Sequence, residues 1–264
     1  MFSKDQLGRL CSIETPPRRL VSLVPSLTEL LIQLNSENRL VGCTKFCIHP
    51  KSVVSRLCKV GGTKTVSVTK VLDLKPDLII ANKEENTAEI IAALETQVPV
   101  WVSDIKTPKD YIQLLQAWSG TVLNNRLTER HIAQFQKMLE ILRGRYKPVR
   151  VAYLIWNKPM MLAGSSTFIS NWIEHLGWIN VAAHLNRYPE INMEALKDLN
   201  PEVILLSSEP FPFKKSHIGF FKNHFPHTKI AVVDGAMFSW YGTRLMKWKT
   251  YANSLERLVN FEKL

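Results

Sequence analysis

The stretch NRLTERHIAQFQKMLEILRGR, residues 125–145, decides the architecture of this chain. Its apolar side chains recur at spacings of three, four and five residues, which is the pattern of one buried stripe along an α-helix. They are Leu127, Ile132, Phe135, Met138, Leu139 and Leu142. Asn125 is a natural N-cap, and Gly144 with Pro148 supplies the stop. At about 1.5 Å per residue such a helix spans roughly 30 Å, the width of a small domain, so it can hold two lobes at a fixed separation.

The sequence on one side of this helix repeats on the other side. In each half a short apolar run, residues 19–24 or 149–155, is followed by a helical pattern. Later in each half, a helix ends in a proline and an acidic residue, and a fully apolar strand follows. Continuous apolar strands separated by helices predict parallel sheets that are covered by helices.

We therefore predict an α/β protein with two Rossmann-like βαβ lobes joined by one long rigid α-helix. The predicted N-terminal lobe is residues 1–123, the linking helix lies in residues 124–147, and the C-terminal lobe is residues 148–264. The alternative is one larger doubly wound sheet, since the length of 264 residues fits either arrangement.

Two local patterns near the N-terminus give further expectations. Residues 5–17 predict an irregular entry, a short hairpin or a strand that covers a sheet edge, before Pro16 and Pro17 halt any helix. Ser26 and Glu29 have the spacing of a capping box at the start of the first core-facing helix.

Composition excludes several classes of protein. The apolar fraction of 45% is ordinary for a folded domain, and the net charge of +11 is spread along the chain without a long basic run, which does not favour a nucleic-acid partner. No run of about 18 apolar residues is present, so a membrane-spanning helix is not expected. The first ten residues lack the basic and apolar regions of a signal peptide, so the sequence as it stands predicts a cytoplasmic protein.

Four cysteines lie in the N-terminal half without the spacing of a disulfide framework: Cys11, Cys43, Cys47 and Cys58. Cys43, Cys47 and His49 are close enough in sequence to be considered as metal ligands. A structural zinc site needs four such groups, and the second cluster is missing. We therefore predict no bound metal.

The candidate ligand surface consists of loops at strand ends in both halves. The first half offers Phe46, His49 and Thr63, and the second offers Trp156, Met160, Phe211, Phe213, Trp240, Tyr241 and Arg244. Aromatic faces provide large rigid contact areas, which suit a flat, bulky ligand. The alternative for each aromatic residue is a role in the core.

Charged and titratable side chains in these loops allow more than one role. Arg244 and Lys158 could pair with acidic groups of a ligand, whereas Arg244 could instead pair with Asp234 or lie on the surface. His49 could be an axial ligand to a metal centre in the bound molecule, or a hydrogen-bonding group of the loop.

Several motifs are spread along the chain: RLVSLVPSLTE (residues 19–29), VGCT (41–44), VGG (60–62), LKPDLII (74–80), YPEI (188–191) and NPEVIL (200–205). Together they resemble the substrate-binding proteins of ABC importers for cobalamin, iron siderophores and haem. This class has a helical backbone, and its cobalamin-binding branch is the nearest. The resemblance covers residues 18–260.

The resemblance implies a non-catalytic protein that captures a bulky metal chelate between two lobes and delivers it to an ABC permease. The ligand would be cobalamin or another corrinoid, a ferric siderophore or haem, with no catalytic cofactor. It also implies a location in the periplasm or cell envelope, and we expect a monomer. Members of the class carry one permease-docking glutamate on each lobe. Glu194 matches the second, but Thr69 stands at the place of the first.

Two rival functions remain open. The first is an α/β enzyme that uses Cys47, His49 and Asp234, although the sequence lacks the nucleophile pattern Gly-x-Ser-x-Gly. The second is an intracellular carrier or sensor of the same fold without a transporter.

Overall fold

The computed structural model describes residues 2–259 and divides the chain into two compact units. Unit 1 comprises the chain up to Ile105, Lys109–Gln134 and Tyr241–Thr243, and unit 2 comprises Lys106–Pro108, Phe135–Trp240 and the chain from Arg244 onward. Each unit contains its own parallel sheet, which confirms the predicted α/β class and rules out one larger doubly wound sheet. The placement of residues 241–243 in unit 1 was not predicted, because the sequence assigned Tyr241 to the second half.

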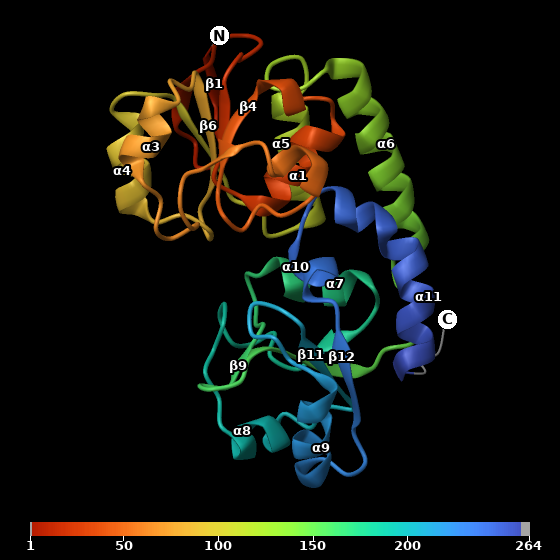
Figure 1. The fold of residues 1–264 in the computed structure, drawn as a ribbon. Coiled ribbons are helices and arrows are strands. Elements are labelled where there is room, and N and C mark those ends of the chain that lie inside the picture. Colours follow the sequence, from red (N-terminus) through yellow and green to blue (C-terminus); the bar gives the residue numbers. More distant parts are fainter. Residues whose placement is uncertain (1, 260–264) are drawn as a thin grey trace. The chain divides into compact units, whose positions relative to one another are not determined.

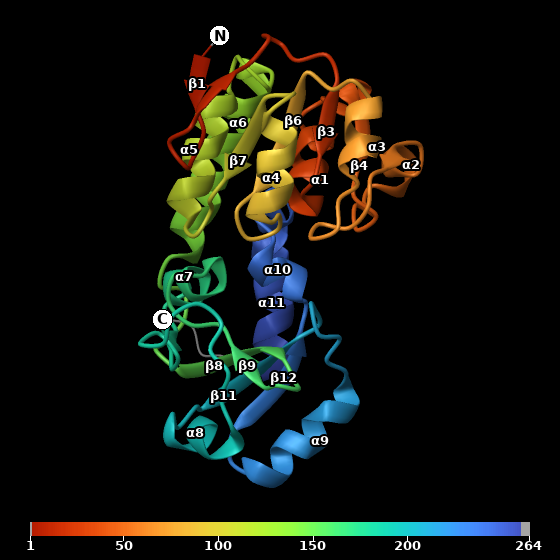
Figure 2. The ribbon, with the colours of Figure 1, turned by 90° about the vertical axis from the view of Figure 1, so that its left-hand side faces the viewer.

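The sheet of unit 1 has five parallel strands in the order β5-β4-β3-β6-β7. The strands are β3 (Leu20–Ser22), β4 (Leu40–Cys43), β5 (Cys58–Lys59), β6 (Leu78–Asn82) and β7 (Val100–Ser103). Figure 2 shows β7, β6, β3 and β4 in this order from left to right. The helices are α1 (Pro25–Gln33), the 3-10 helix η1 (Glu37–Arg39), α2 (Lys51–Val54), α3 (Val68–Asp73), α4 (Ala88–Glu95) and α5 (Pro108–Trp118).

Apolar strands explain why helices cover both faces of this sheet. Every residue of β6 is buried, as expected for a central strand of a parallel sheet. On one face, Val71 of α3 and Leu94 of α4 pack on strand residues such as Ile79. Figure 1 shows α3 and α4 on this face, with α1 and α5 on the opposite face.

A short N-terminal hairpin, one of the alternatives expected for residues 5–17, borders β7, and its strands lie within residues 2–12. It consists of β1 (Phe2–Lys4) and β2 (Leu10–Ser12), which pair antiparallel. The buried carboxylate of Asp5 accepts hydrogen bonds from the backbone N–H of Leu7 and Arg9 and from that of Val102 in β7, at 3.0, 3.0 and 3.2 Å. These bonds fix the hairpin to the edge of the sheet.

Unit 2 contains a second parallel sheet, in the order β10-β8-β11-β12, with β9 antiparallel to β8. The strands are β8 (Arg150–Trp156), β9 (Met161–Leu162), β10 (Ile179–Asn180), β11 (Val203–Ser207) and β12 (Lys229–Val233). The helices are α7 (Phe168–His175), α8 (Met193–Asp198), α9 (Lys215–His224), α10 (Gly235–Ser239), the 3-10 helix η2 (Thr243–Lys247) and α11 (Trp248–Val259).

The two faces of this sheet have different cores. On one face, Leu196 of α8 and Phe221 of α9 pack on strand residues such as Leu206. On the other face, α7, α10 and α11 contribute an aromatic cluster, in which the Trp248 ring lies 5.2 Å from Trp172 and 5.0 Å from Phe238. Figure 1 shows α8 and α9 on one side of the strands and α7 and α10 on the other.

The helix predicted at residues 125–145 is α6 (Asn125–Leu142). It is continuous and begins at the predicted residue, but Asn124 rather than Asn125 caps it: the Asn124 side-chain oxygen accepts a hydrogen bond from the Leu127 N–H at 3.2 Å. The helix ends before Gly144, whose φ of +56° places it in the left-handed region that terminates helices. The boundary between the units lies within α6, where Gln134 belongs to unit 1 and Phe135 to unit 2.

The capping box predicted at Ser26 and Glu29 is wrong. Val24 is the N-cap of α1, and within the described residues no side chain caps this helix. Pro25 occupies the first helical position, where the N–H it lacks is not needed. Glu29 instead accepts a hydrogen bond from the Thr243 hydroxyl at 2.8 Å.

The predicted internal repeat extends to individual hydrogen bonds. Helices α3 and α8 are both followed, two residues after their last helical residue, by a residue with positive φ that directly precedes the proline and the acid: Lys75 at 46° and Asn200 at 45°. In unit 1 the Arg19 side chain donates to the Leu74 carbonyl, and in unit 2 the Arg150 side chain donates to that of Leu199, both at 2.7 Å. In each unit, an arginine at the start of the first strand of the parallel sheet therefore caps the end of the equivalent helix.

One buried histidine, His131, and one half-buried histidine, His175, predict that the protein loses stability in acid. Burial lowers the pKa of His131, whose Nε2 lies 2.9 Å from the Tyr111 hydroxyl, and burial also lowers the pKa of His175. The unfolded chain takes up these protons near pH 6.5, whereas the folded protein resists them. Stability is therefore fully present above about pH 6.5 and falls as the pH drops toward the folded pKa values.

Thermal unfolding followed by circular dichroism between about pH 8 and about pH 5 measures this effect. His131→Gln, which cannot be protonated, is expected to show a flatter decline than the wild type. His49→Gln serves as the control, because His49 is exposed on a loop. Identical pH profiles for His131→Gln and the wild type would refute the role of His131.

Candidate ligand-binding site

Loops at the carboxyl ends of the unit 1 strands carry Phe46, His49 and Thr63. Phe46 is 51% exposed, and its ring lies beside Gly62, where a β-carbon would approach the ring to 3.2 Å. His49 is exposed, whereas Thr63 is buried. The Lys45 N–H donates to the Gly61 carbonyl at 2.8 Å, so the two loops support each other. The side chains of Phe46 and His49 are thus exposed at this end of the sheet, whereas that of Thr63 is not.

A buried pair of asparagines fixes these loops. The Asn86 side-chain oxygen accepts from the Asn82 N–H at 2.9 Å, and its amide donates to the carbonyls of Thr63 at 3.0 Å and Leu23 at 3.4 Å. The Asn82 amide donates to the Ser103 hydroxyl at 3.0 Å. This network links the ends of β3, β6 and β7 to the loop of residues 60–63, here called the glycine loop. The network was not predicted from the sequence.

Tyr241 is anchored in unit 1. Its side chain is buried, and its hydroxyl forms hydrogen bonds with the side chains of Ser26 and Ser103. Burial raises the pKa of Tyr241 well above its ordinary value, so the side chain stays neutral. These contacts give Tyr241 a structural role at the start of α1, and only a small part of its surface is accessible.

In unit 2, an aromatic group lies where β8 and β11 end. The Trp156 ring is 5.7 Å from Phe211 in an edge-to-face arrangement, and Phe211 lies 4.7 Å from Phe213. Trp156 is 36% exposed, whereas Phe213 is only 3% exposed and belongs to the core, as does much of Met160. Trp156 and Phe211 are therefore the aromatic side chains of this group that are at least partly exposed, and the buried Phe213 packs against Phe211.

A second group in unit 2 contains Trp240, Arg244 and Glu209. The Arg244 guanidinium lies over the Trp240 ring at 4.1 Å from its centroid, a cation–π arrangement. The Trp240 indole N–H and the Ser239 hydroxyl both donate to the Glu209 carboxylate. Burial raises the pKa of Glu209, and these hydrogen bonds with the nearby charge of Arg244 offset part of that rise.

Glu209 is the polar residue of unit 2 that the sequence analysis did not select. Glu209 follows β11, lies directly before Pro210 and belongs to the same loop as Phe211. Its position in this aromatic loop is the sequence signal that could have identified it as a candidate site residue. Asp234, the alternative partner for Arg244, accepts a hydrogen bond from the Ala236 N–H at 3.0 Å and caps α10.

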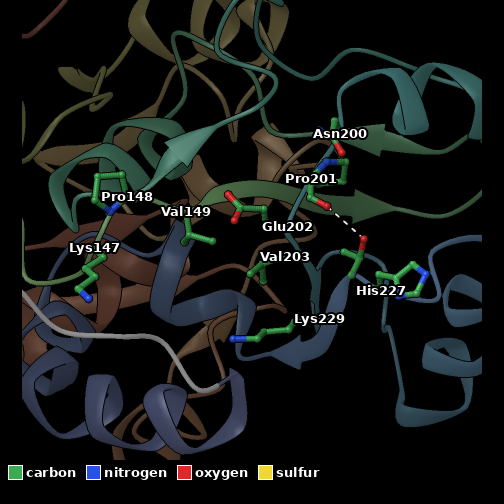
Figure 3. Close-up of a pocket in the computed structure, with 10 residues that line it drawn as sticks. Lys147, Pro148, Val149, Asn200, Pro201, Glu202, Val203, His227 and Lys229 are labelled. Carbon is green, nitrogen blue, oxygen red and sulfur yellow. Dashed lines mark hydrogen bonds between the residues drawn. The ribbon is translucent and has the colours of Figure 1, made fainter.

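A pocket of about 500 Å³ lies at the other end of the unit 2 strands, where β8, β11 and β12 begin. Figure 3 shows its lining, which includes Lys147, Glu202, His227 and Lys229. None of the ligand residues selected from the sequence is in this lining. Ligands of open parallel sheets bind outside the carboxyl ends of the strands, so we do not assign this pocket as the site.

The residues considered as metal ligands do not gather at one site in the described part of the chain. Among residues 2–259, no three His, Cys, Asp or Glu side chains gather as a metal site requires, so His49 does not join Cys43 and Cys47. Cys47 is buried in unit 1, and Asp234 caps a helix in unit 2. Over the same residues, no helix has the length and apolar character needed to cross a bilayer.

The two candidate docking positions are equivalent in the repeat. Glu194 is the second residue of α8, and Thr69 is the second residue of α3. Both side chains are exposed, and each helix is capped by the residue before it, Asn192 or Ser67.

Comparison with known proteins agrees with this fold. Vitamin B12-binding protein from Vibrio cholerae is 27% identical over 197 residues, which cover 73% of this chain and 71% of that protein. The crystal structure of the periplasmic vitamin B12 binding protein BtuF of Vibrio cholerae matches with a TM-score of 0.80 at 21% identity, over 93% of this chain and 98% of that one. A periplasmic haem-binding protein from Pseudomonas aeruginosa matches with a TM-score of 0.73 at 20% identity, over 94% and 95%.

The structural matches have low sequence identity and therefore establish the fold. The family assignment rests on a separate result, in which the periplasmic binding protein family matches residues 20–227, or about four fifths of the chain. This family consists of substrate-binding proteins rather than enzymes. The chain belongs to the periplasmic binding protein family.

Proposed function

We propose that this protein is the substrate-binding component of an ABC importer and that it binds a bulky metal chelate, with cobalamin as the first candidate. The observation that carries the proposal is the family match over residues 20–227. The choice of cobalamin is supported by the relatives that are described as vitamin B12-binding proteins. Haem and ferric siderophores remain the other members of the same ligand class.

The chemistry of the unit 2 loops supports a large ligand with both apolar faces and polar groups. Trp156 and Phe211 present aromatic surface at the ends of β8 and β11. Trp240 adds a ring whose orientation is fixed by Glu209 and Arg244. A corrin or porphyrin ring suits the aromatic surface, and the guanidinium of Arg244 suits an acidic substituent on such a ring.

We further propose that the protein is not an enzyme, that it acts as a monomer, and that it works in the periplasm or cell envelope. The proposal is supported by the family, which consists of substrate-binding proteins, and by Asp234 of the rival catalytic set, which caps α10. The proposed location is supported by the family to which the chain belongs.

Absorption spectra test the proposed ligand class. Purified protein is mixed separately with cyanocobalamin, haemin and a ferric siderophore, and each mixture is separated by gel filtration. We expect one of these chromophores to elute with the protein at a ratio near one per chain. Elution of all three entirely apart from the protein would refute the proposal.

Docking to a permease is expected to depend on Glu194. A carboxylate at the rim of an interface pairs with a basic group of the partner, so Glu194→Ala should weaken association with the cognate importer. Thr69→Glu restores the equivalent charge on α3 and is expected to leave association equal or tighter. Co-purification with the importer in detergent measures both changes.

Glu190→Ala is the matched control, because Glu190 is an exposed glutamate of the same unit that precedes α8. If Glu194→Ala binds the importer as tightly as Glu190→Ala and the wild type, the docking assignment is wrong.

A further inference from the structure

Cys43 and Cys47 form a buried pair of thiols in unit 1. Cys43 is the last residue of β4, and Cys47 lies four residues later in the loop that carries Phe46 and His49. Their exposed fractions are 0% and 2%, and the two thiols are hydrogen-bonded to each other. A bond between them would close a segment of five residues.

Polar side chains contact both sulfurs, although the pair also packs against apolar side chains such as Val54. The Lys59 ammonium donates to the Cys43 sulfur and to the Cys47 carbonyl, both at 3.1 Å. The hydroxyl oxygens of Thr28 and Thr44 lie 3.2 and 3.3 Å from the Cys47 sulfur. A cation beside a thiol stabilises its thiolate form.

The shared hydrogen bond gives the two sulfurs different acidities. The bond from the Cys43 thiol lowers the pKa of Cys47, and the two threonine hydroxyls lower it further. The same bond and burial raise the pKa of Cys43. The pair thus loses one proton readily and retains the other, which provides one nucleophilic thiolate beside one thiol.

We propose that Cys43 and Cys47 are a reversible redox pair, which a small hydroperoxide oxidises to a disulfide and a dithiol reduces again. A small oxidant is required because both sulfurs are buried. The arrangement resembles that of redox-sensing cysteines in having an attacking sulfur next to a resolving one.

The reaction proceeds in two steps. The Cys47 thiolate attacks one oxygen of hydrogen peroxide, the O–O bond breaks, and the products are a sulfenic acid and hydroxide. The Cys43 sulfur then attacks the sulfenic sulfur, the S–O bond breaks, and the hydroxyl leaves as water with the Cys43 proton. Overall, two thiols and one peroxide give one disulfide and two waters, with a transfer of two electrons.

Formation of the disulfide is expected to rearrange the loop. The sulfurs must approach to about 2.05 Å, and the bond from Lys59 to Cys43 loses its thiol partner. Residues 44–46 lie inside the closed segment, and the Lys45 N–H bond to Gly61 connects this segment to the glycine loop. If the proposed function holds, oxidation therefore changes the positions of the Phe46 and His49 side chains and with them the affinity for a ligand.

Peptide mapping by mass spectrometry tests the pair without any ligand. Reduced wild-type protein is treated with one equivalent of hydrogen peroxide, unfolded, alkylated with iodoacetamide and digested. We expect a linked Cys43–Cys47 species that has lost two hydrogens and resists alkylation, and we expect dithiothreitol to reverse it. Cys58, which is exposed, and Cys11, which is buried and donates to the Val100 carbonyl at 3.2 Å, are internal controls that remain alkylated.

Two variants separate the attacking from the resolving sulfur. In Cys43→Ser, dimedone is expected to trap a sulfenic acid on Cys47. In Lys59→Gln, disulfide formation should slow by about tenfold or more, because the cation that contacts the Cys43 sulfur and the Cys47 carbonyl, and so stabilises a negative charge on the pair, is gone. Hydrogen exchange should differ between the oxidised and reduced wild type in residues 44–50 and remain unchanged in α8.

Three results would overturn the proposal: Cys43 and Cys47 stay fully alkylatable, Cys58 is oxidised as fast as they are, or they form sulfinic acid without a disulfide. Because no ligand enters this assay, its failure leaves the proposed importer function intact. Conversely, failure of the chromophore screen does not affect the redox pair.

Discussion

Replacement of Trp240 by alanine is expected to weaken chelate binding by about 1 to 3 kcal/mol, or about 5- to 150-fold in the dissociation constant. Trp240 is held between the Arg244 guanidinium, 4.1 Å from its centroid, and the Glu209 carboxylate. A ring that is fixed in this way offers stacking surface without a large loss of side-chain entropy on binding. Fluorescence or absorbance titration with the chromophore that co-elutes with the protein measures the change.

Phe220→Ala is the matched control for this variant. Phe220 is an aromatic residue of α9 with 52% exposure, and α9 packs on the sheet face opposite to α10. Its removal is expected to leave affinity unchanged. Unchanged affinity in Trp240→Ala, together with a large drop in melting temperature, would show that Trp240 is a core residue instead.

Replacement of Asn86 by alanine is expected to lower the free energy of unfolding by about 3 kcal/mol. The substitution leaves the Asn82 N–H and the Thr63 carbonyl in a buried environment without their partner. Each such group costs about 1 to 3 kcal/mol, and the costs do not add fully. Because Asn86 connects strand ends to the glycine loop, ligand affinity is expected to fall as well. Urea unfolding measures the stability.

Asn192→Ala is the control for Asn86→Ala. Asn192 is an exposed cap of α8 and accepts a hydrogen bond from the Ala195 N–H at 2.8 Å. Loss of a cap costs about 1 kcal/mol, so this variant should be clearly more stable than Asn86→Ala. Equal losses of unfolding free energy in the two variants would contradict the role of Asn86 in holding the strand ends and the glycine loop together.

The parts of the fold that follow from periodicity were predictable from the sequence. The stripe from Leu127 to Leu142 predicted the start of α6, because a helix that buries one face must repeat every 3.6 residues. The proline and acid after α3 and α8 predicted the internal repeat, since a chain can leave a helix and enter a buried strand in few ways. The cap at Asn124 was missed because two adjacent asparagines are equally suited to it.

The site was less predictable, because it depends on contacts between residues that are distant in sequence. The Asn86 side chain bonds to Leu23 and Thr63, at separations of 63 and 23 residues. No local pattern contains that information. Tyr241 was assigned to the wrong half because its neighbours in sequence belong to unit 2, while its own hydroxyl is bonded to Ser26 in unit 1.

The exposed aromatic residues were predictable only as a set. Loops rich in aromatic residues and proline identified Trp156, Phe211 and Phe213 together, but the sequence could not separate the exposed Trp156 from the buried Phe213. Which member of such a set faces a ligand is decided by the packing of α9 beneath the loop, a tertiary property.

Isothermal titration calorimetry of the wild-type protein with cyanocobalamin tests the central claim most directly, with haemin and a ferric siderophore as parallel titrants. The account predicts saturable binding of one chelate class at one molecule per chain, with the ligand recovered chemically unchanged. Absence of binding by all three, or conversion of a bound chelate into a different compound, would contradict it.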